Sequence, residues 1–579
     1  MISPRRFLLV GVSALTLMAA FCLSTGCQPK SHPAPFTARL TEIEGVQAVY
    51  TLRHPKLILG DLDKLMTEVP EAALLRMGLA QLTPYGYPEF SELAAGSNIG
   101  IALLELAPED FSAGTPTLVA FAKLKEGGKI WTLLAQRGLV LQKHDEWTWI
   151  AQDVSAFAKI KAPAPLIAYI DQPQTEELRG WGRLTPALLG RAKDYVLPLL
   201  EAKLAARPAA EQKALLAYVN VLWGYLAQLH SAGGSLDFND QGVTLFSSAQ
   251  FLPESPAGTF LRYAPGPAPK IAQSVPGDAL MSVAVRQNMT GQIEFVRTVL
   301  DSLIAVDYPA GAEPLRTAKA SYLAFAGHSD GGAVLTMNMT LPKDGQAPAI
   351  DVLGVQSGRF TEAQVGAFYR DSLALSQKFT NATFAALSVM TPNAPLPELH
   401  QELTENALTI DGIHFGSIIT TTKATVASHE QTTTTTQYYG VVGGNLVYAV
   451  NEAALREKIP AIAAKRLVSN PVDLMFKDDE VAVMALHGGK MVDMVAGAAQ
   501  IDLADADIQA QVTTLKQAYT AGGPVKIIIG ASQAQGTVTL SIPYKFIAQS
   551  VRLGQFVSAY KAPAPGPLAA GPVAATMQP

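Results

Sequence analysis

Short β-rich runs recur along the chain, and each is followed by a segment whose apolar residues have helical spacing. The first unit opens with residues 46–52, and apolar residues spaced for one face of a helix follow over 57–69. Two further β-rich runs, 99–106 and 117–124, are joined through the polar, Gly-containing stretch 108–114. The pattern predicts a strand, a helix and a two-stranded hairpin, in that order.

The same order of elements is predicted three more times. Polar turns at Asn239–Gly242 and Gln533–Gly536 separate alternating runs and mark two of the hairpins. The predicted segments are strand 166–170, helices 176–204 and 211–229 and hairpin 235–246 for the second unit; strand 279–285, helix 290–304 and hairpin 321–341 for the third; and strand 481–486, helices 491–499 and 506–519 and hairpin 525–540 for the fourth.

Two similar segments lie between these units. Residues 147–160 and 446–459 align without gaps as a strand, an acidic or amide cap, and a helix that ends in Lys-Ile. The caps in this alignment are Gln152-Asp153 and Asn451-Glu452. We interpret the repetition as a duplicated half that holds two units and one inserted strand–helix piece. Ordinary α+β patterning also produces weak similarity of this kind, so that alternative stays open.

The expected architecture is an α+β protein with two similar halves, residues 37–264 and 271–561. Each half is expected to hold two strand–helix–hairpin units in a mainly antiparallel sheet, with helices packed on it. The stretch 265–270 serves as the linker between halves, because its three prolines continue neither a helix nor an interior strand.

The composition indicates a chain that folds by apolar burial. Of its 579 residues 49% are hydrophobic, which is ample for two or more domains. The only cysteines are Cys22 and Cys27, so the body of the chain has no intrachain disulfide and no cysteine-based metal site. The formal charge is -5, and Lys and Arg do not cluster with aromatic residues, so nucleic acid is not expected as a partner. No cofactor is expected.

The N-terminus has the organisation of an export signal. Arg5 and Arg6 precede an apolar run over 7–23, and the small residues Ser24-Thr25-Gly26 lead to Cys27. Basic residues stay on the cytoplasmic side while the apolar run enters the bilayer, and small residues leave an extended segment that a peptidase accepts. The pattern predicts a secretory signal peptide over residues 1–27.

These residues resemble the signal of bacterial lipoproteins. The resemblance covers residues 5–27 only, and Ser24 stands where that family usually has leucine. It implies that Cys27 is acylated and becomes the first residue of the mature protein, and Gln28 after it suggests the outer membrane. Residues 28–36 then form a Pro-containing tether, and the Pro/Ala/Gly-rich stretch 562–579 a disordered tail. A plain secretory signal and an uncleaved anchor remain as alternatives.

Gly327-His-Ser-Asp-Gly331 matches G-x-S-x-G, the nucleophile elbow of α/β-hydrolases. In that elbow the serine stands between a strand and a helix, whereas the alternating residues 332–341 predict a second strand. We therefore interpret Asp330-Gly331 as a hairpin turn in which the glycine supplies a positive φ, with Ser329 as nucleophile the alternative. A triad also needs an acid and a histidine; the downstream histidines are His400, His414, His429 and His487.

Other polar groups have simpler interpretations than a site. Asp502, Asp505 and Asp507 lack the spacing of a calcium loop and are expected to cap the helix after them. The histidines form no H-x-x-x-H pair, and Gly488-Gly-Lys490 lacks the remainder of a phosphate-binding loop. No catalytic, cofactor-binding or metal-ligating residue is predicted.

Two stretches suit interaction. Residues 418–425 and 432–439 are Thr-rich and predict a long hairpin whose exposed edge accepts a partner strand. The helix 213–229 carries a broad apolar stripe around Trp223 and Leu226 that is either core or the lining of a lipid groove.

The expected function is that of a lipid-anchored cell-envelope protein, a non-enzymatic binding or scaffold lipoprotein. Its partners are the membrane, through the anchor on Cys27, and a protein or an apolar ligand. Two alternatives remain: a cell-surface serine hydrolase that uses Ser329, and an envelope carrier of apolar ligands.

Overall fold

The structure is a computed structural model. It describes residues 45–55, 57–58, 60–61, 67, 92–104, 117–161, 163–205, 209–239, 241–262, 279–305, 312–340, 349–374, 398–426, 429–463, 476, 480–498, 501 and 504–561. Outside these residues lie the signal with Cys27, the tether 28–36, the linker 265–270, the tail 562–579 and most of the helix expected over 57–69.

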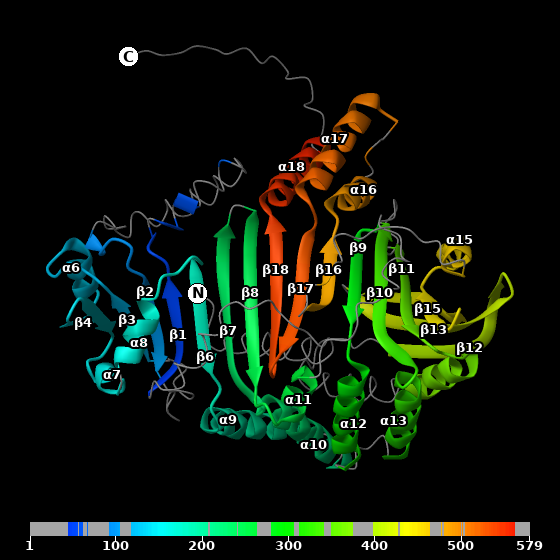
Figure 1. Ribbon diagram of the computed structural model, residues 1–579, viewed down its shortest axis with the longest axis horizontal. Helices are drawn as coiled ribbons and strands as arrows, with labels where there is room; N and C mark the ends of the chain where they lie inside the picture. The colour runs from blue at the N-terminus through cyan, green and yellow to red at the C-terminus, as the bar shows by residue number, and fades with distance from the viewer. Residues whose placement is uncertain are drawn as a thin grey trace.

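The described residues form mixed helix and strand around one large antiparallel sheet of 18 strands (Figure 1). The strands are β1 (Val46–Leu52), β2 (Ile99–Leu104), β3 (Leu118–Ala122), β4 (Val140–His144), β5 (Trp147–Ala151), β6 (Leu178–Arg183), β7 (Leu229–Asn239), β8 (Gly242–Phe251), β9 (Met281–Arg286), β10 (Ser329–Thr340), β11 (Ala349–Gly358), β12 (Glu398–Ile410), β13 (Ile413–Val426), β14 (His429–Val442), β15 (Asn445–Ala449), β16 (Glu480–Leu486), β17 (Val525–Ser532) and β18 (Gln535–Pro543).

Along the chain, most helices come between two strands. They are α6 (Lys129–Gln136), α7 (Ser155–Ala158), α8 (Pro163–Ile170), α9 (Pro186–Leu204), α10 (Ala209–Leu226), α11 (Pro256–Arg262), α12 (Met289–Ala305), α13 (Ala312–Ala326), α15 (Glu452–Ala463), α16 (Gly488–Ala498), α17 (Ala506–Gly522) and α18 (Tyr544–Lys561). Residues 362–374 are also helical.

The strand pairings give a single order across the sheet. It runs β4-β5-β3-β2-β1-β6-β7-β8-β18-β17-β16-β9-β10-β11-β15-β14-β13-β12, with every pair antiparallel. The first and last parts of the chain meet in the middle, where β8 pairs with β18 from Gly242↔Pro543 to Gln250↔Gln535.

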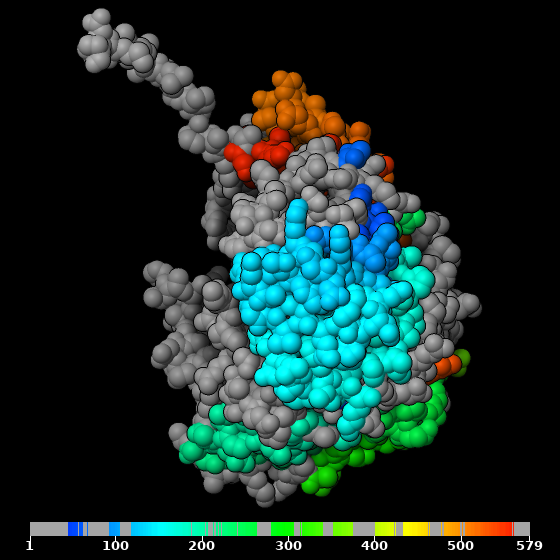
Figure 2. All heavy atoms as spheres, turned by 90° about the vertical axis from the view of Figure 1, so that its left-hand side faces the viewer, coloured from blue at the N-terminus to red at the C-terminus, as the bar shows by residue number. Residues whose placement is uncertain are grey.

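Helices gather at both ends of the central strands. In Figure 1, α9 to α13 lie along the lower edge of the sheet and α16 to α18 along the upper edge. The side view in Figure 2 shows the cyan segment around α6, α7 and α8 gathered over the β2–β5 side. Here Phe121, Trp149 and Phe157 form a buried aromatic cluster with edge-to-face contacts of 5.3 and 5.9 Å between ring centroids.

Most of the predicted elements are confirmed, because their periodicity is carried by buried residues. The hairpins β2–β3, β7–β8, β13–β14 and β17–β18 pair as expected. Strands β1, β9 and β16 and helices α12, α16 and α17 also lie within a few residues of the predicted bounds. The two inserted pieces are a strand followed by a helix in both places, β5–α7 and β15–α15.

The start of the second unit was predicted wrongly. Residues 166–170 belong to helix α8, which Pro163 opens, because a short apolar run suits a buried helix as well as a buried strand. Residues 178–183 form strand β6 instead of helix. Gly180 lies under the ring of Tyr50 on β1, where an added Cβ would come within 2.6 Å of Tyr50 Cδ1, so tertiary packing fixes the strand.

Of the hairpin predicted over 321–341, the second strand is confirmed as β10, whereas the first strand and the hairpin turn are wrong. Residues 312–326 form helix α13, which buries Leu315, Ala318 and Phe325 at helical spacing. The chain then turns and enters β10, which pairs with β9 on one side and β11 on the other. Gly331 has the expected positive φ of 84°, but within an irregular stretch of β10 and not in a hairpin turn.

Candidate functional site

Ser329 is the first residue of β10 and lies between a helix and a strand. The order helix, turn, strand is the reverse of a nucleophile elbow. Its Oγ accepts hydrogen bonds from the amide of Gly331 at 3.1 Å and from Nε2 of Gln356 at 3.0 Å. The neighbouring His328 ring bonds through Nε2 to Gln364 Nε2 at 2.7 Å. These contacts tie the serine into the start of the strand and leave its oxygen an acceptor.

The histidines proposed as triad partners lie on other elements. His400 is exposed on β12, His414 bonds through Nδ1 to Thr409 Oγ1 at 3.1 Å, and His429 begins β14. His487 stands between β16 and α16, and its amide donates to the carbonyl of Leu280. Within the described part of the chain, none of these residues bonds to Ser329.

The acidic group before α17 serves as a helix cap. Asp505 Oδ1 accepts from the amides of Asp507 at 2.9 Å and Ile508 at 3.2 Å, which confirms the capping interpretation for Asp505. Asp507 stands in the first turn, and Asp502 lies outside the described residues. The described residues bring no three of His, Cys, Asp and Glu together in a metal-binding arrangement.

The Thr-rich hairpin does not form the sheet edge. Strand β13 pairs with β12 on one side and β14 on the other, and Thr421 and Thr434 face each other with their Oγ1 atoms 3.5 Å apart. Among the described strands the outer one of this side is β12, which carries Glu398, Glu402 and Glu405. Within the described part of the chain, the edge strand is therefore acidic and is not the predicted threonine run.

Helix α10 covers most of the apolar stripe predicted over 213–229. Tyr225 packs edge-to-face on Phe295 of α12 with centroids 5.9 Å apart, and Trp223 and Leu226 are half-buried. Core packing is thus shown for Tyr225.

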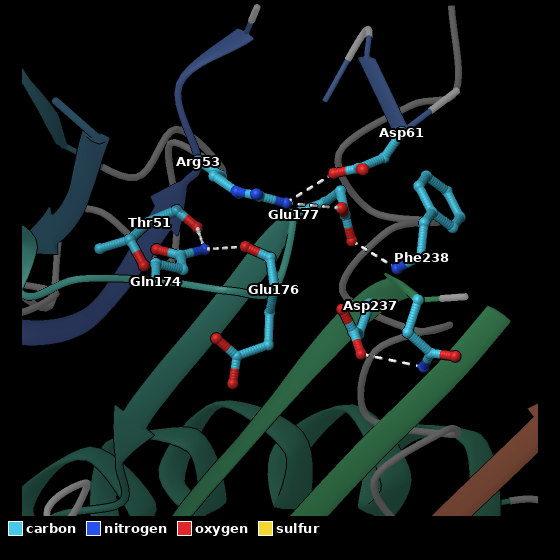
Figure 3. A network of polar contacts seen from close by, with 9 residues as sticks. Thr51, Arg53, Asp61, Gln174, Glu176, Glu177, Asp237 and Phe238 are labelled. Carbon is cyan, nitrogen blue, oxygen red and sulfur yellow. Dashed lines mark hydrogen bonds and ion pairs between the residues drawn. The ribbon is translucent and has the colours of Figure 1, made fainter. Parts of the chain in front are cut away.

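A largely buried polar network joins the ends of β1, β6 and β7 (Figure 3). Arg53, directly after β1, donates through Nη1 to Asp61 Oδ2 at 2.7 Å and to Glu177 Oε1 at 3.2 Å. The second oxygen of Glu177 accepts from the amide of Phe238 at 2.6 Å. The side chain of Glu177 is only 3% exposed, so the ion pair and the amide bond offset the cost of burying its charge.

Burial raises the pKa of the Glu177 carboxyl above its ordinary 4.5. The hydrogen bond from Phe238 opposes this shift, and the charges of Asp237 and Asp61 add to it. Asp237 itself accepts from Asn239 Nδ2 at 3.0 Å. The network therefore holds a carboxyl that takes up a proton more readily than a surface glutamate does.

A second arginine, which is buried, stands at the end of β9. Arg286 Nε donates to the carbonyl of Glu480 at 2.6 Å, its guanidinium lies 5.0 Å from the ring centroid of Phe476, and Glu480 is itself buried. Sequence reasoning missed both arginines. The available indication was that Arg53 and Arg286 each follow directly on an apolar strand, where an arginine needs a partner.

The Arg53 network holds several strand ends together. Nearly all of Glu177 is covered, and the bonds of Arg53 run to three different parts of the chain: the segment after β1, the start of β6 and, through Glu177, the end of β7. This network fixes the strand ends and buries a carboxyl group that can bind a proton.

An apolar row crosses one face of the sheet. Following the registers from strand to strand, the row reads Leu52, Leu178, Leu236, Leu245, Leu540, Ile527, Met484, Val283 and Leu335 from β1 to β10. Leu178 and Leu245 are 39% and 44% exposed, and the others are half-buried. Nine neighbouring strands thus carry apolar side chains at positions that pair with one another across the sheet.

Comparison with known proteins gives no relative. No family model matches the chain, and no curated protein or solved structure is significantly similar to it. Among the described helices, none combines the length and the apolarity needed to cross a membrane.

Proposed function

We propose that this protein is a lipid-anchored cell-envelope protein with a non-enzymatic binding or scaffold role, built by duplication of one α+β unit. The observation that carries the duplication is the pattern of strand pairing on the two sides of the central β8–β18 pair. The corresponding pairs are β1–β2 and β9–β10, β2–β3 and β10–β11, β3–β5 and β11–β15, β4–β5 and β14–β15, β1–β6 and β9–β16, β6–β7 and β16–β17, and β7–β8 and β17–β18.

The residue registers support the same correspondence. The last residue pair before the turn is Asn239↔Gly242 in β7–β8 and Ser532↔Gln535 in β17–β18, and we take these two pairs as equivalent. When the registers are followed from there to the neighbouring strands, Leu178 of β6 takes the place of Ala482 of β16. On the next strands, Leu52 of β1 takes the place of Val285 of β9. Arg53 then corresponds to Arg286. Glu177 corresponds to Glu480, with one extra residue at an irregularity in β16. Partly buried Arg53 and buried Arg286 stand at equivalent places; Arg53 bonds to the carboxylate of Glu177 and Arg286 to the backbone carbonyl of Glu480.

Helix caps add a further correspondence. Asp153 Oδ1 accepts from the amide of Ser155 at 2.7 Å, and Asn451 Oδ1 accepts from that of Ala453 at 2.8 Å. Each cap stands two residues after the end of its strand, β5 or β15. The structure thus pairs Asp153 with Asn451, whereas the gapless sequence alignment paired Asp153 with Glu452, one residue further along. Strands β12 and β13 have no counterpart among the described residues of the first half.

The anchor part of the proposal rests on Arg5, Arg6, the apolar run and Cys27. Palmitate incorporation in a bacterial host tests it: we expect labelling of the wild-type chain and none of Cys27→Ala. Labelling that persists in Cys27→Ala, or no labelling of either chain, contradicts the anchor.

The surroundings of Ser329 support the proposal that the protein is not an enzyme. The Oγ of Ser329 accepts hydrogen bonds from Gly331 and Gln356, and among the described residues no histidine is bonded to it. A fluorophosphonate probe tests it. We expect no labelling of the folded wild-type chain; labelling that disappears in Ser329→Ala establishes the hydrolase instead. Ser321→Ala, a serine of the preceding helix, is the matched control.

The carrier alternative has one specific observation in its favour, the apolar row across nine strands. Titration with a fluorescent fatty acid tests it. Saturable binding that Leu245→Asp weakens and Leu252→Asp does not would favour a carrier, because Leu252 is as exposed as Leu245 but lies after the end of β8.

A further inference from the structure

Helix α9 turns an apolar face outward. Tyr195, Val196 and Leu199 are 43%, 39% and 52% exposed, and Pro198 and Ala202 beside them are exposed as well. Isolated apolar residues on a surface need no explanation, but a contiguous group on one helix does.

The exposed group occupies one side of the helix. Successive residues are about 100° apart, so Leu199 lies almost above Tyr195 and Val196 lies next to them. Leu204, on the opposite side, is buried against the body. The exposed acids Asp194 and Glu201 lie outside the apolar arc. The exposed side of α9 therefore has an apolar part, which faces away from the protein, and an acidic part next to it.

Two cationic side chains lie in or near this arc. At about 100° per residue, Arg191 lies within the arc, between Pro198 and Ala202, and Lys193 lies beyond Val196 toward the buried side. Both are partly exposed. An apolar strip with cations in or near it is a pattern that a phospholipid surface accommodates, with the apolar side chains among the acyl chains and the cations at the phosphates.

The position of α9 suits contact with a flat surface. It lies along the lower edge of the sheet, across the strand ends, and the side view also places the teal and green α9–α10 pair at the lower end of the molecule (Figures 1 and 2). A helix in this position is able to lie parallel to a bilayer below the protein.

The chain enters the described fold at the same edge. Gln47, the second residue of β1, donates through Nε2 to the carbonyl of Arg183, and Thr185 two residues later caps α9. Cys27 lies 18 residues before Gly45, a span of at most about 60 Å when fully extended. A lipid on Cys27 therefore keeps a bilayer within reach of α9.

We propose that α9 lies on the surface of the phospholipid bilayer to which the protein is anchored, with Tyr195, Val196 and Leu199 inserted among the acyl chains. The inference rests on the proposed lipid anchor and deepens it. The anchor supplies attachment, and α9 supplies a fixed orientation of the sheet relative to the membrane.

The test uses one labelled cysteine in the full chain. After removal of the signal and lipidation of Cys27, the mature protein has no other thiol, so Leu199→Cys is labelled selectively with an environment-sensitive nitrobenzoxadiazole group. Glu201→Cys, exposed two residues away on the polar side, is the matched control. Both proteins are reconstituted into phosphatidylethanolamine/phosphatidylglycerol vesicles with and without a lipid that carries a quencher on its acyl chain. Circular dichroism checks that both variants fold alike.

We expect the quencher lipid to reduce emission from residue 199 severalfold relative to residue 201, with a blue shift at 199 only. Equal quenching at the two positions overturns the inference, as does a blue shift at 199 without quenching, which indicates a protein partner. Co-sedimentation with the vesicles separates the two proposals. Proteins that sediment but show no quenching at 199 retain the anchor and lose the α9 contact, whereas proteins that do not sediment contradict both.

Discussion

Tyr448 of β15 lies across Gly354, its cross-strand partner on β11. A Cβ added at Gly354 would come within 2.0 Å of Tyr448 Cζ, so the ring occupies the space of the missing side chain. The same arrangement recurs between Tyr439 and Gly416. A glycine inside a strand weakens it, and a ring laid over the glycine restores the lost packing.

We therefore expect Gly354→Ala to lower the free energy of unfolding by about 2 kcal/mol, because the added methyl group displaces a half-buried ring. In a Tyr448→Ala background the same change should cost close to nothing, which gives a coupling energy of about 1 to 3 kcal/mol. Urea unfolding of the four proteins measures it. Gly366→Ala is the control: nothing lies within 4 Å of its added Cβ, and alanine stabilises a helix interior by about 1 kcal/mol. Equal costs of Gly354→Ala in both backgrounds would refute the ring contact.

The sequence predicts elements well where a single period dominates. The alternation in β7–β8 and β17–β18 and the helical spacing in α12 and α17 identify these elements without tertiary information. Prediction from periodicity fails where contacts with distant segments of the chain determine the secondary structure. Residues 178–183 were expected in a helix, and only the pairing with β1, where Tyr50 lies over Gly180, makes them strand β6. The alanine-rich α13 shows its helical period only through buried Leu315 and Phe325.

The buried network illustrates what sequence reasoning could not supply. Arg53 and Glu177 are 124 residues apart, and their contact depends on the pairing of β1 with β6, which local patterns do not encode. Asp505 was predictable as a cap because its two partners are its neighbours in sequence. Local signals reach as far as caps and turns, whereas the groups that hold this sheet together meet only through its topology.

Removing Arg53 should be costly. Arg53→Met leaves Asp61 and Glu177 largely buried without their shared guanidinium, and we expect a loss of about 3 to 5 kcal/mol of unfolding free energy. Arg316→Met is the matched control, since Arg316 forms an exposed pair with Glu313 that is worth at most about 1 kcal/mol. Chemical denaturation compares the two. Adding Glu177→Gln to Arg53→Met should recover part of the loss; a further loss would mean that the two residues do not act as a pair.

Glu177 should also give stability a pH dependence of known sign. Burial raises its pKa above the ordinary 4.5, so the folded state binds this proton more tightly than the unfolded state does. The contribution of Glu177 to stability is therefore full below the ordinary pKa and declines as the pH rises to the raised one. The free energy of unfolding of Glu177→Gln minus that of the wild type should increase with pH over this window and then level off.

Unfolding in urea at a series of pH values from 4 upward, about half a unit apart, measures that difference. Glu254→Gln provides the control, because Glu254 is exposed and pairs only with Arg262 at the surface within the described residues. A difference for Glu177→Gln that stays flat, or that falls as the pH rises, would contradict the burial of an ionised carboxylate at this position.

The seam between β8 and β18 offers a test of how the two parts of the chain are joined. Gly242 pairs with Pro543, and a Cβ there would lie 2.1 Å from the carbonyl oxygen of Ile542. That neighbour is backbone and cannot rotate away, so Gly242→Ala should force the strands apart and cost about 2 to 4 kcal/mol. Gly224→Ala, which meets nothing within 4 Å, should leave stability unchanged or raise it.

Hydrogen exchange locates the damage. In Gly242→Ala we expect the amides of β8 and β18 to exchange faster than in the wild type, while those of β2–β3 and β10–β11 keep their protection. Such a result identifies the seam as the weakest boundary in the sheet, as two units joined along one strand pair require. Exchange that rises evenly across all strands would instead mean that the sheet opens as one cooperative body.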